Sequence, residues 1–163
     1  MQVSELLVFP LCSDIDTGSS VCPALIDHRD LKGSTALMTA SAMSHLAVVK
    51  RLIEARAAVN SPDYKGRTPL ITAVGVGAYD VVEALCAAGA NLSLAGERGR
   101  SALHAAVEYN SVDIVRVLIE HGVNINAQDA NKRTPLHVAT EMQVLRASCA
   151  EILLRYLGIL SVF

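Results

Sequence analysis

The sequence contains no tryptophan, and aromatic residues make up only 4% of its 163 positions. Pockets that bind flat cofactors are commonly lined by aromatic side chains, so this scarcity argues against such a pocket. Hydrophobic residues nevertheless account for 52% of the chain, and most of them are alanine, valine and leucine. Because such small side chains let helices approach one another closely, the composition favours closely packed helices.

A strong net charge is also absent. The formal charge is −2, so no overall excess indicates binding to nucleic acid or to an anionic membrane. The four cysteines, Cys12, Cys22, Cys86 and Cys149, include no Cys-x-x-Cys pair, and no histidine cluster has zinc-finger spacing. A disulfide between Cys12 and Cys22 is one interpretation. The interpretation that we favour is that the cysteines are reduced and structural. It predicts an intracellular protein, cytoplasmic or nuclear.

Long apolar runs are missing as well. The short N-terminal run at 6–11 contains Pro10, and no basic residue precedes it, since the first is Arg29. A signal peptide is therefore not expected. No stretch approaches the roughly 18 apolar residues that indicate a membrane span, so we predict no membrane insertion.

What the sequence does contain is a tandem repeat. Gly33, Gly66 and Gly99 are evenly spaced, and a further step of the same length reaches Lys132. Two positions after each of them stands threonine or serine, and leucine follows two positions later. The leucines are Leu37, Leu70, Leu103 and Leu136. A register that repeats in this way predicts stacked units that share one core.

The repeated positions resemble the ankyrin repeat. Its Thr-Pro-Leu-His-x-Ala signature is complete at 134–139, lacks the histidine at 68–73, and lacks the proline at 101–106. The resemblance implies an all-α fold, an α-solenoid of helix–turn–helix units with short β-hairpin loops. It places the ankyrin-repeat domain at 24–163, with repeats at about 30–62, 63–95, 96–128 and 129–160.

Both ends depart from the register. Residues 24–30 resemble the end of a preceding repeat, but the polar stretch before them predicts a disordered or loosely docked segment at 1–23. In the fourth repeat the expected branched apolar pair is Ala147-Ser148, and the pattern returns about two positions later, which indicates an insertion between the two helices. The apolar tail after Gly158 is unlike a polar cap, so we expect a piece or a variant of a longer ankyrin protein.

No catalytic motif is found in the sequence. It contains no Walker motif, no His-Glu-x-x-His and no Gly-x-Ser-x-Gly, so we predict that the protein is not an enzyme and has no cofactor. His104 and His137 could suggest a metal site or a general base. Each lies in the turn motif of its own repeat, however, and the favoured interpretation is a structural hydrogen bond to the adjoining loop.

The resemblance also implies a partner-binding surface, because ankyrin proteins bind other proteins through the tips of their loops and the exposed side of their first helices. Carried onto this sequence, the candidate residues are Lys32, Met43, Tyr64, Lys65, Arg67, Arg98, Arg100, Glu108, Tyr109, Asn131, Arg133, Glu141 and Met142. Leu31, Gly75 and Val76 occupy further positions of the same kind.

Basic residues are frequent at the predicted loop tips. Seven of the fourteen lysines and arginines of the chain lie there: Lys32, Lys65, Arg67, Arg98, Arg100, Lys132 and Arg133. One interpretation is an ordinary solvated face. The other is a basic strip for an acidic or phosphorylated segment of a partner, with Tyr64 and Tyr109 as aromatic anchors.

The leading functional prediction is a monomeric, non-enzymatic adaptor or scaffold that binds another protein and no nucleic acid. The alternatives are a stoichiometric inhibitor of a protein kinase or other enzyme, and the substrate-recognition part of a larger ubiquitin-ligase-type protein. The resemblance further makes Asn60 and Asn126 candidate acceptors for an intracellular asparaginyl hydroxylase. A structural asparagine in a tight loop is the other interpretation of both residues.

Overall fold

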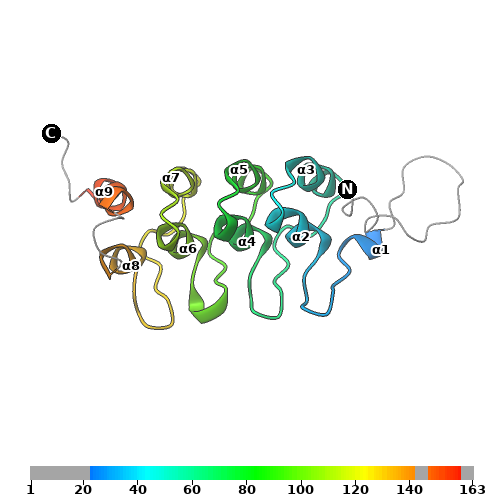
Figure 1. Cartoon of the computed structure of the whole chain (residues 1–163), viewed down its shortest axis with the longest axis horizontal. Coiled ribbons are helices and arrows are strands. Elements are labelled where there is room, and N and C mark those ends of the chain that lie inside the picture. Colours follow the sequence, from blue (N-terminus) through cyan, green and yellow to red (C-terminus); the bar gives the residue numbers. More distant parts are fainter. Residues whose placement is uncertain (1–22, 142–146, 159–163) are drawn as a thin grey trace, which may run out of the picture.

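A computed structural model describes residues 23–141 and 147–158, which form a row of paired helices (Figure 1). The inner helices form one layer: α2 (Ala36–Ala42), α4 (Pro69–Val76), α6 (Ala102–Glu108) and α8 (Pro135–Glu141). The outer helices form a second layer: α3 (Leu46–Glu54), α5 (Tyr79–Ala87), α7 (Val112–Glu120) and α9 (Ala147–Tyr156). A short helix, α1 (Pro23–Ile26), precedes them. The predicted all-α solenoid of helix–turn–helix units is confirmed.

The inner helices begin at the threonine or serine of the repeated motif, because this side chain caps the helix. The Thr35 hydroxyl accepts a hydrogen bond from the Met38 N–H at 3.4 Å, and the Thr68 hydroxyl accepts one from the Ile71 N–H at 3.3 Å. Pro69 then occupies the first turn of α4, where its missing N–H is not needed. The repeated motif is therefore a helix start signal.

The core lies between the two layers and continues from one repeat to the next. Leu37, Leu70 and Leu103 are at most 1% exposed, and the outer helices contribute Leu85 and Leu118, which are fully buried. Each inner helix contacts the next inner helix, and each outer helix contacts the next outer helix. No repeat encloses its own apolar residues, so stability depends on stacking.

The fourth repeat keeps this core in a shifted register. Cys149 and Leu153 of α9 are fully buried, as are the apolar residues Ile114 and Leu118 of α7. Cys149 corresponds to Ile114, and Leu153 corresponds to Leu118. Each lies two positions later in the sequence than the repeat interval would place it. The buried positions thus fit the shift seen in the sequence. The turn predicted to hold the insertion, at 142–146, lies outside the described residues, as does the N-terminal segment before Pro23.

Short loops, which we call fingers, project from the inner layer at residues 30–34, 63–67, 96–100 and 129–133 (Figure 1). A backbone hydrogen bond closes each finger at its base; the Asp63 N–H, for example, donates to the Arg67 carbonyl at 2.9 Å. Within the described part of the chain, strand pairing is limited to an isolated antiparallel bridge between Ala95 and Ser101. The loops are therefore tight turns rather than extended hairpins.

Candidate protein-interaction surface

An aspartate holds the finger in shape in three of the four repeats. In the second finger, one oxygen of Asp63 accepts hydrogen bonds from the N–H groups of Lys65 and Arg67, at 2.9 and 2.8 Å. Asp129 has the same role in the fourth finger. Burial alone would raise the pKa of Asp129, but hydrogen bonds from the backbone and side chain of Arg133 outweigh it and lower the pKa to about 2. This carboxylate is therefore ionised at neutral pH and can pair with the arginine of its finger.

His104 joins the third repeat to the fourth finger. Its Nε2 lies 3.0 Å from the Arg133 carbonyl oxygen, and its Nδ1 lies 2.8 Å from the Ser101 hydroxyl. Because a carbonyl oxygen only accepts, Nε2 carries the proton and Nδ1 accepts from Ser101. Burial lowers the pKa of His104, which keeps the ring neutral. The expected structural role is confirmed for His104.

His137 repeats the first half of this arrangement at the end of the array. Its Nδ1 lies 2.7 Å from the Thr134 hydroxyl, but the ring is exposed. Across residues 23–141 and 147–158, no group of three or more histidine, cysteine, aspartate or glutamate side chains is placed to hold a metal ion. In the same two ranges, no helix is long and apolar enough to cross a membrane.

The finger arginines form ion pairs inside the chain. Arg133 contacts two carboxylates: its Nε and Nη2 lie 3.0 and 2.8 Å from Asp129, and its Nη1 lies 2.9 Å from Glu141. In the third repeat, Arg100 pairs through Nη1 with Glu108. The sequence contained the signal for both pairs, since each glutamate stands at the same offset from its arginine and the two pairs are one repeat apart. Neither pair was predicted from the sequence.

Arg67 and Lys65 of the second finger also have acidic neighbours. Arg67 Nε and Nη2 lie 2.9 and 2.8 Å from one oxygen of Asp63. Lys65 Nζ lies 3.9 Å from Glu97 in the next finger, and both side chains are largely exposed. The proposed basic strip is therefore partly neutralised by the chain itself. The basic residues of the row without an ion pair in the described part are Lys32, Arg98 and Lys132.

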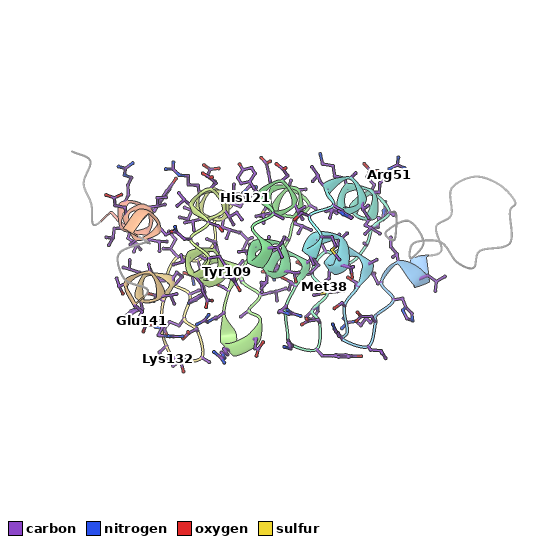
Figure 2. The ribbon with its side chains drawn as sticks, viewed as in Figure 1. Met38, Arg51, Tyr109, His121, Lys132 and Glu141 are labelled. Carbon is purple, nitrogen blue, oxygen red and sulfur yellow. The ribbon has the colours of Figure 1, made fainter. Side chains whose placement is uncertain are left out.

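These three residues lie at the ends of the fingers. All three are exposed, as is Asn131, and Figure 2 shows Lys132 at the tip of its finger. Arg98 and Lys132 have positive φ angles of 62° and 63°, which place both in the left-handed region. Lysine and arginine adopt this conformation only at a cost, so each of these two fingertips contains a strained backbone position.

Exposed apolar side chains lie beside the basic residues. Met43, Val76 and Tyr109 follow one another at the repeat interval at the ends of the inner helices, and they are 64%, 51% and 60% exposed. Leu31 and Tyr64 occupy the first two fingertips and are still more exposed. We call these five residues the apolar strip. Large exposed side chains in a regular row typically mark an interaction site.

The remaining predicted residues are distributed as follows. Asn60 is exposed, and its side-chain oxygen accepts a hydrogen bond from the Asn91 N–H at 2.7 Å, linking two successive loops. Asn126 is exposed too, and its N–H donates to the Asn124 side chain at 3.0 Å. Hydroxylation of either residue stays a prediction. Met142 lies outside the described residues.

The outer layer has a different character. The pKa of Tyr79 is raised, first by the charge of Glu83 and then by partial burial and the charges of Glu120, Asp113 and Asp80, so acidic side chains of α5 and α7 lie around this tyrosine. A depression of about 250 Å³ between α7 and α9 is lined by Arg116, Ile152, Arg155 and Tyr156. Burial raises the pKa of Cys86 in α5 to about 11, so this thiol is protonated at neutral pH and is a poor nucleophile.

Comparison with known protein families accounts for this repeating geometry. A family model described as ankyrin repeats (3 copies) matches residues 11–96 and also residues 89–160. Together, these matches cover most of the chain. No curated protein matches the sequence.

Proposed function

The chain belongs to the ankyrin-repeat family, and we propose that it is a monomeric adaptor or scaffold whose partner binds the fingers and the inner helices. Ankyrin repeats are protein–protein interaction modules. The observation that carries the proposal is the apolar strip, in which Leu31, Met43, Tyr64, Val76 and Tyr109 are all at least half exposed. Methionine and tyrosine are enriched at protein interfaces, where they supply apolar area and tyrosine adds a hydrogen-bonding group.

The acidic side chains around Tyr79 support binding of an acidic partner on the opposite side of the molecule. A partner segment with acidic residues is repelled by Glu83 and its neighbours, whereas the fingers offer Lys32, Arg98 and Lys132. The buried, protonated thiol of Cys86 agrees with an intracellular setting, which is part of the proposal.

Site-specific photo-crosslinking in cells tests the binding side. A photoreactive amino acid replaces Met43 or Tyr109 on the inner side. As matched controls, it replaces Arg51 of α3 (Figure 2) or Arg116 of α7 on the outer side of the same repeats. We expect one shared set of crosslinked proteins from the two inner positions and little from the two outer positions. Equal crosslinking from both sides would contradict the proposal.

The identity of the crosslinked proteins then separates the functional classes. A protein kinase that loses activity in the complex would favour the stoichiometric inhibitor, and a cullin complex would favour the ubiquitin-ligase receptor. A client with neither property would favour the plain adaptor.

A further inference from the structure

The fourth repeat shows the complete environment of a finger arginine. Asp129 binds the Nε and Nη2 side of Arg133, and Glu141 binds Nη1 from the C-terminal end of α8, at 2.9 Å. Arg133 thus has one carboxylate on each side of its guanidinium group. Both carboxylates belong to the same repeat, at fixed distances along the sequence from the arginine.

Arg67 of the second repeat has only one of these two carboxylates. Its Nε and Nη2 bind Asp63 at 2.9 and 2.8 Å, as in the fourth repeat. The position that corresponds to Glu141 two repeats earlier is Gly75, which has no side chain. Within the described residues, no hydrogen bond or ion pair of Arg67 Nη1 is found, and the Arg67 side chain is 43% exposed.

The space beside Gly75 is open. A Cβ atom built there would meet nothing nearer than Cε2 of Tyr109, at 3.9 Å, which is an ordinary contact. Tyr109 of the apolar strip borders this space, Val76 directly follows Gly75 in the chain, and Met43 occupies the position of Val76 in the preceding repeat. The second repeat therefore combines an arginine Nη1 without a carboxylate partner in the described residues with exposed apolar side chains nearby in the sequence and at Tyr109.

We propose that Arg67 Nη1 and the open space beside Gly75 bind a glutamate or aspartate side chain of the protein partner, and that apolar residues next to this acidic residue pack on Met43, Val76 and Tyr109. The inference rests on the proposed function, since it assigns the chemistry of the partner segment. The partner carboxylate occupies the place that Glu108 and Glu141 fill in the following repeats.

The electrostatics favour a carboxylate over a phosphate. Burial alone would raise the pKa of Asp63 beside Arg67, but hydrogen bonds from Arg67 and Lys65 outweigh it and the pKa is lowered. Asp63 is therefore ionised and already neutralises the guanidinium charge. A dianionic phosphate placed there is repelled by Asp63, whereas a single negative charge on Nη1 matches the pairs of the next two repeats.

Arg67 also differs from the unpaired cations of the fingertips in being held by a carboxylate of its own finger. Two contacts to Asp63 fix its guanidinium group before a partner arrives, so little side-chain entropy is lost on binding. Lys32, Arg98 and Lys132 are exposed fingertip residues without such a fixed partner in the described part of the chain. These three cations attract an acidic segment at a distance, whereas Arg67 binds its carboxylate at a defined place.

Peptide selection on the full chain tests the proposal. A random peptide library displayed on phage is selected against the 163-residue protein, and a synthetic copy of a selected peptide is then titrated. We expect the selected peptides to share one aspartate or glutamate next to apolar residues. Changing this residue to its amide should weaken binding about tenfold, the range for a hydrogen-bonded charged pair.

Variants of the second repeat locate the contact. Arg67→Gln should weaken the peptide about tenfold, and the amide peptide should then bind this variant no worse than the acidic one. Gly75→Glu keeps Arg67 and Asp63 in place and supplies an internal carboxylate that both competes for Nη1 and repels the carboxylate of the peptide, so it should weaken the acidic peptide to a similar degree. Arg51→Gln, a change at an exposed arginine of the outer helix α3, is the matched control and should leave the affinity within about twofold.

Each remaining outcome would overturn the proposal in a distinguishable way. Selected peptides that lack a shared acidic residue, or an acidic residue that matters equally with and without Arg67, would contradict the carboxylate site but leave protein binding standing. Tighter binding of a phosphoserine version would show a phosphate site instead. A library that yields no binder, or binders insensitive to changes at Met43 and Tyr109, would contradict the proposed function as well.

Discussion

Arg67 and Arg133 occupy the same position in the second and fourth repeats, yet they differ in the carboxylates around them. Arg133 lies between Asp129 and Glu141, whereas Asp63 is the single carboxylate that pairs with Arg67 among the described residues. The third repeat lacks the other of the two carboxylates, the finger aspartate. There Arg100 pairs with Glu108, but Gly96 replaces the finger aspartate, and Arg100 Nε is buried without a hydrogen-bond partner within the described residues.

This difference separates two kinds of position in the repeat. The interior positions are nearly identical from repeat to repeat, because neighbouring units must stack on one another. The positions around the finger arginine tolerate loss of a carboxylate, since water or a partner can replace it at an exposed site. Variation at Gly75 and Gly96 thus changes the proposed binding surface without changing the fold.

The second and third repeats bury equivalent leucines, so a core substitution should have the same effect in both. Leu70 and Leu103 are at most 1% exposed in equivalent places, so changing either to alanine should lower the free energy of unfolding by about 3 kcal/mol. Leu136 is only half-buried in the last repeat, so Leu136→Ala should lower the free energy of unfolding clearly less. Urea titration measures all three variants. If Leu70→Ala alone lowered the free energy of unfolding by less than about 1 kcal/mol, the cores of the two repeats would not be equivalent.

A second test uses the histidine that the second repeat lacks. The equivalent position in the second repeat, 71, is isoleucine, whereas His104 binds Ser101 and the Arg133 carbonyl. His104→Ile leaves those two groups unpaired, so it should lower the free energy of unfolding by about 2 kcal/mol. Urea unfolding of the variant beside the unchanged protein at neutral pH measures this loss.

The same variant should change the pH dependence of stability. Burial holds the pKa of His104 below its ordinary value of 6.5, so the unfolded chain binds the proton first as the pH falls. The free energy of unfolding therefore declines as the pH drops below 6.5 and is unaffected by this group above it. His104→Ile should flatten that decline in a pH series. An equal slope in both proteins would show that His104 does not cause it.

Lys132 tests the finger backbone of the fourth repeat against that of the others. Its φ of 63° matches the glycines at 33, 66 and 99, but a lysine is strained in this region. Lys132→Gly should raise the free energy of unfolding by about 1 kcal/mol, and Gly66→Ala, at φ 76°, should lower it by a similar amount. Thermal unfolding of both variants checks the pair; destabilisation by Lys132→Gly would contradict the interpretation.

The contact between the second and third fingers should matter least. Lys65 and Glu97 are separated by 3.9 Å, and both side chains are more than half exposed. Water and salt screen such a pair, so Lys65→Met should change the free energy of unfolding by less than about 0.5 kcal/mol. Urea unfolding at low and high salt measures it, and a large loss at low salt alone would show that the fingers support each other electrostatically.

Much of the fold could be predicted from the sequence, because the repeat is strictly periodic where stacking constrains it. The spacing of Leu37, Leu70 and Leu103 predicted the inner helices and their burial. The ion pairs of the fingers were not predicted, although Glu108 and Glu141 share the same offset from their arginines. Surface pairing depends on side-chain direction across a turn, and periodicity of single positions does not reveal it.

We infer that Arg67 presents a free edge to the space beside Gly75. A double-mutant cycle measures this directly: Gly75→Glu and Gly75→Ala are compared with and without Arg67→Gln, and alanine removes the contribution of helix propensity. We predict a favourable coupling of about 0.5 kcal/mol between the new glutamate and Arg67, similar to that of Arg100 with Glu108. A coupling of zero in the second repeat, beside a measurable one in the third, would contradict the claim.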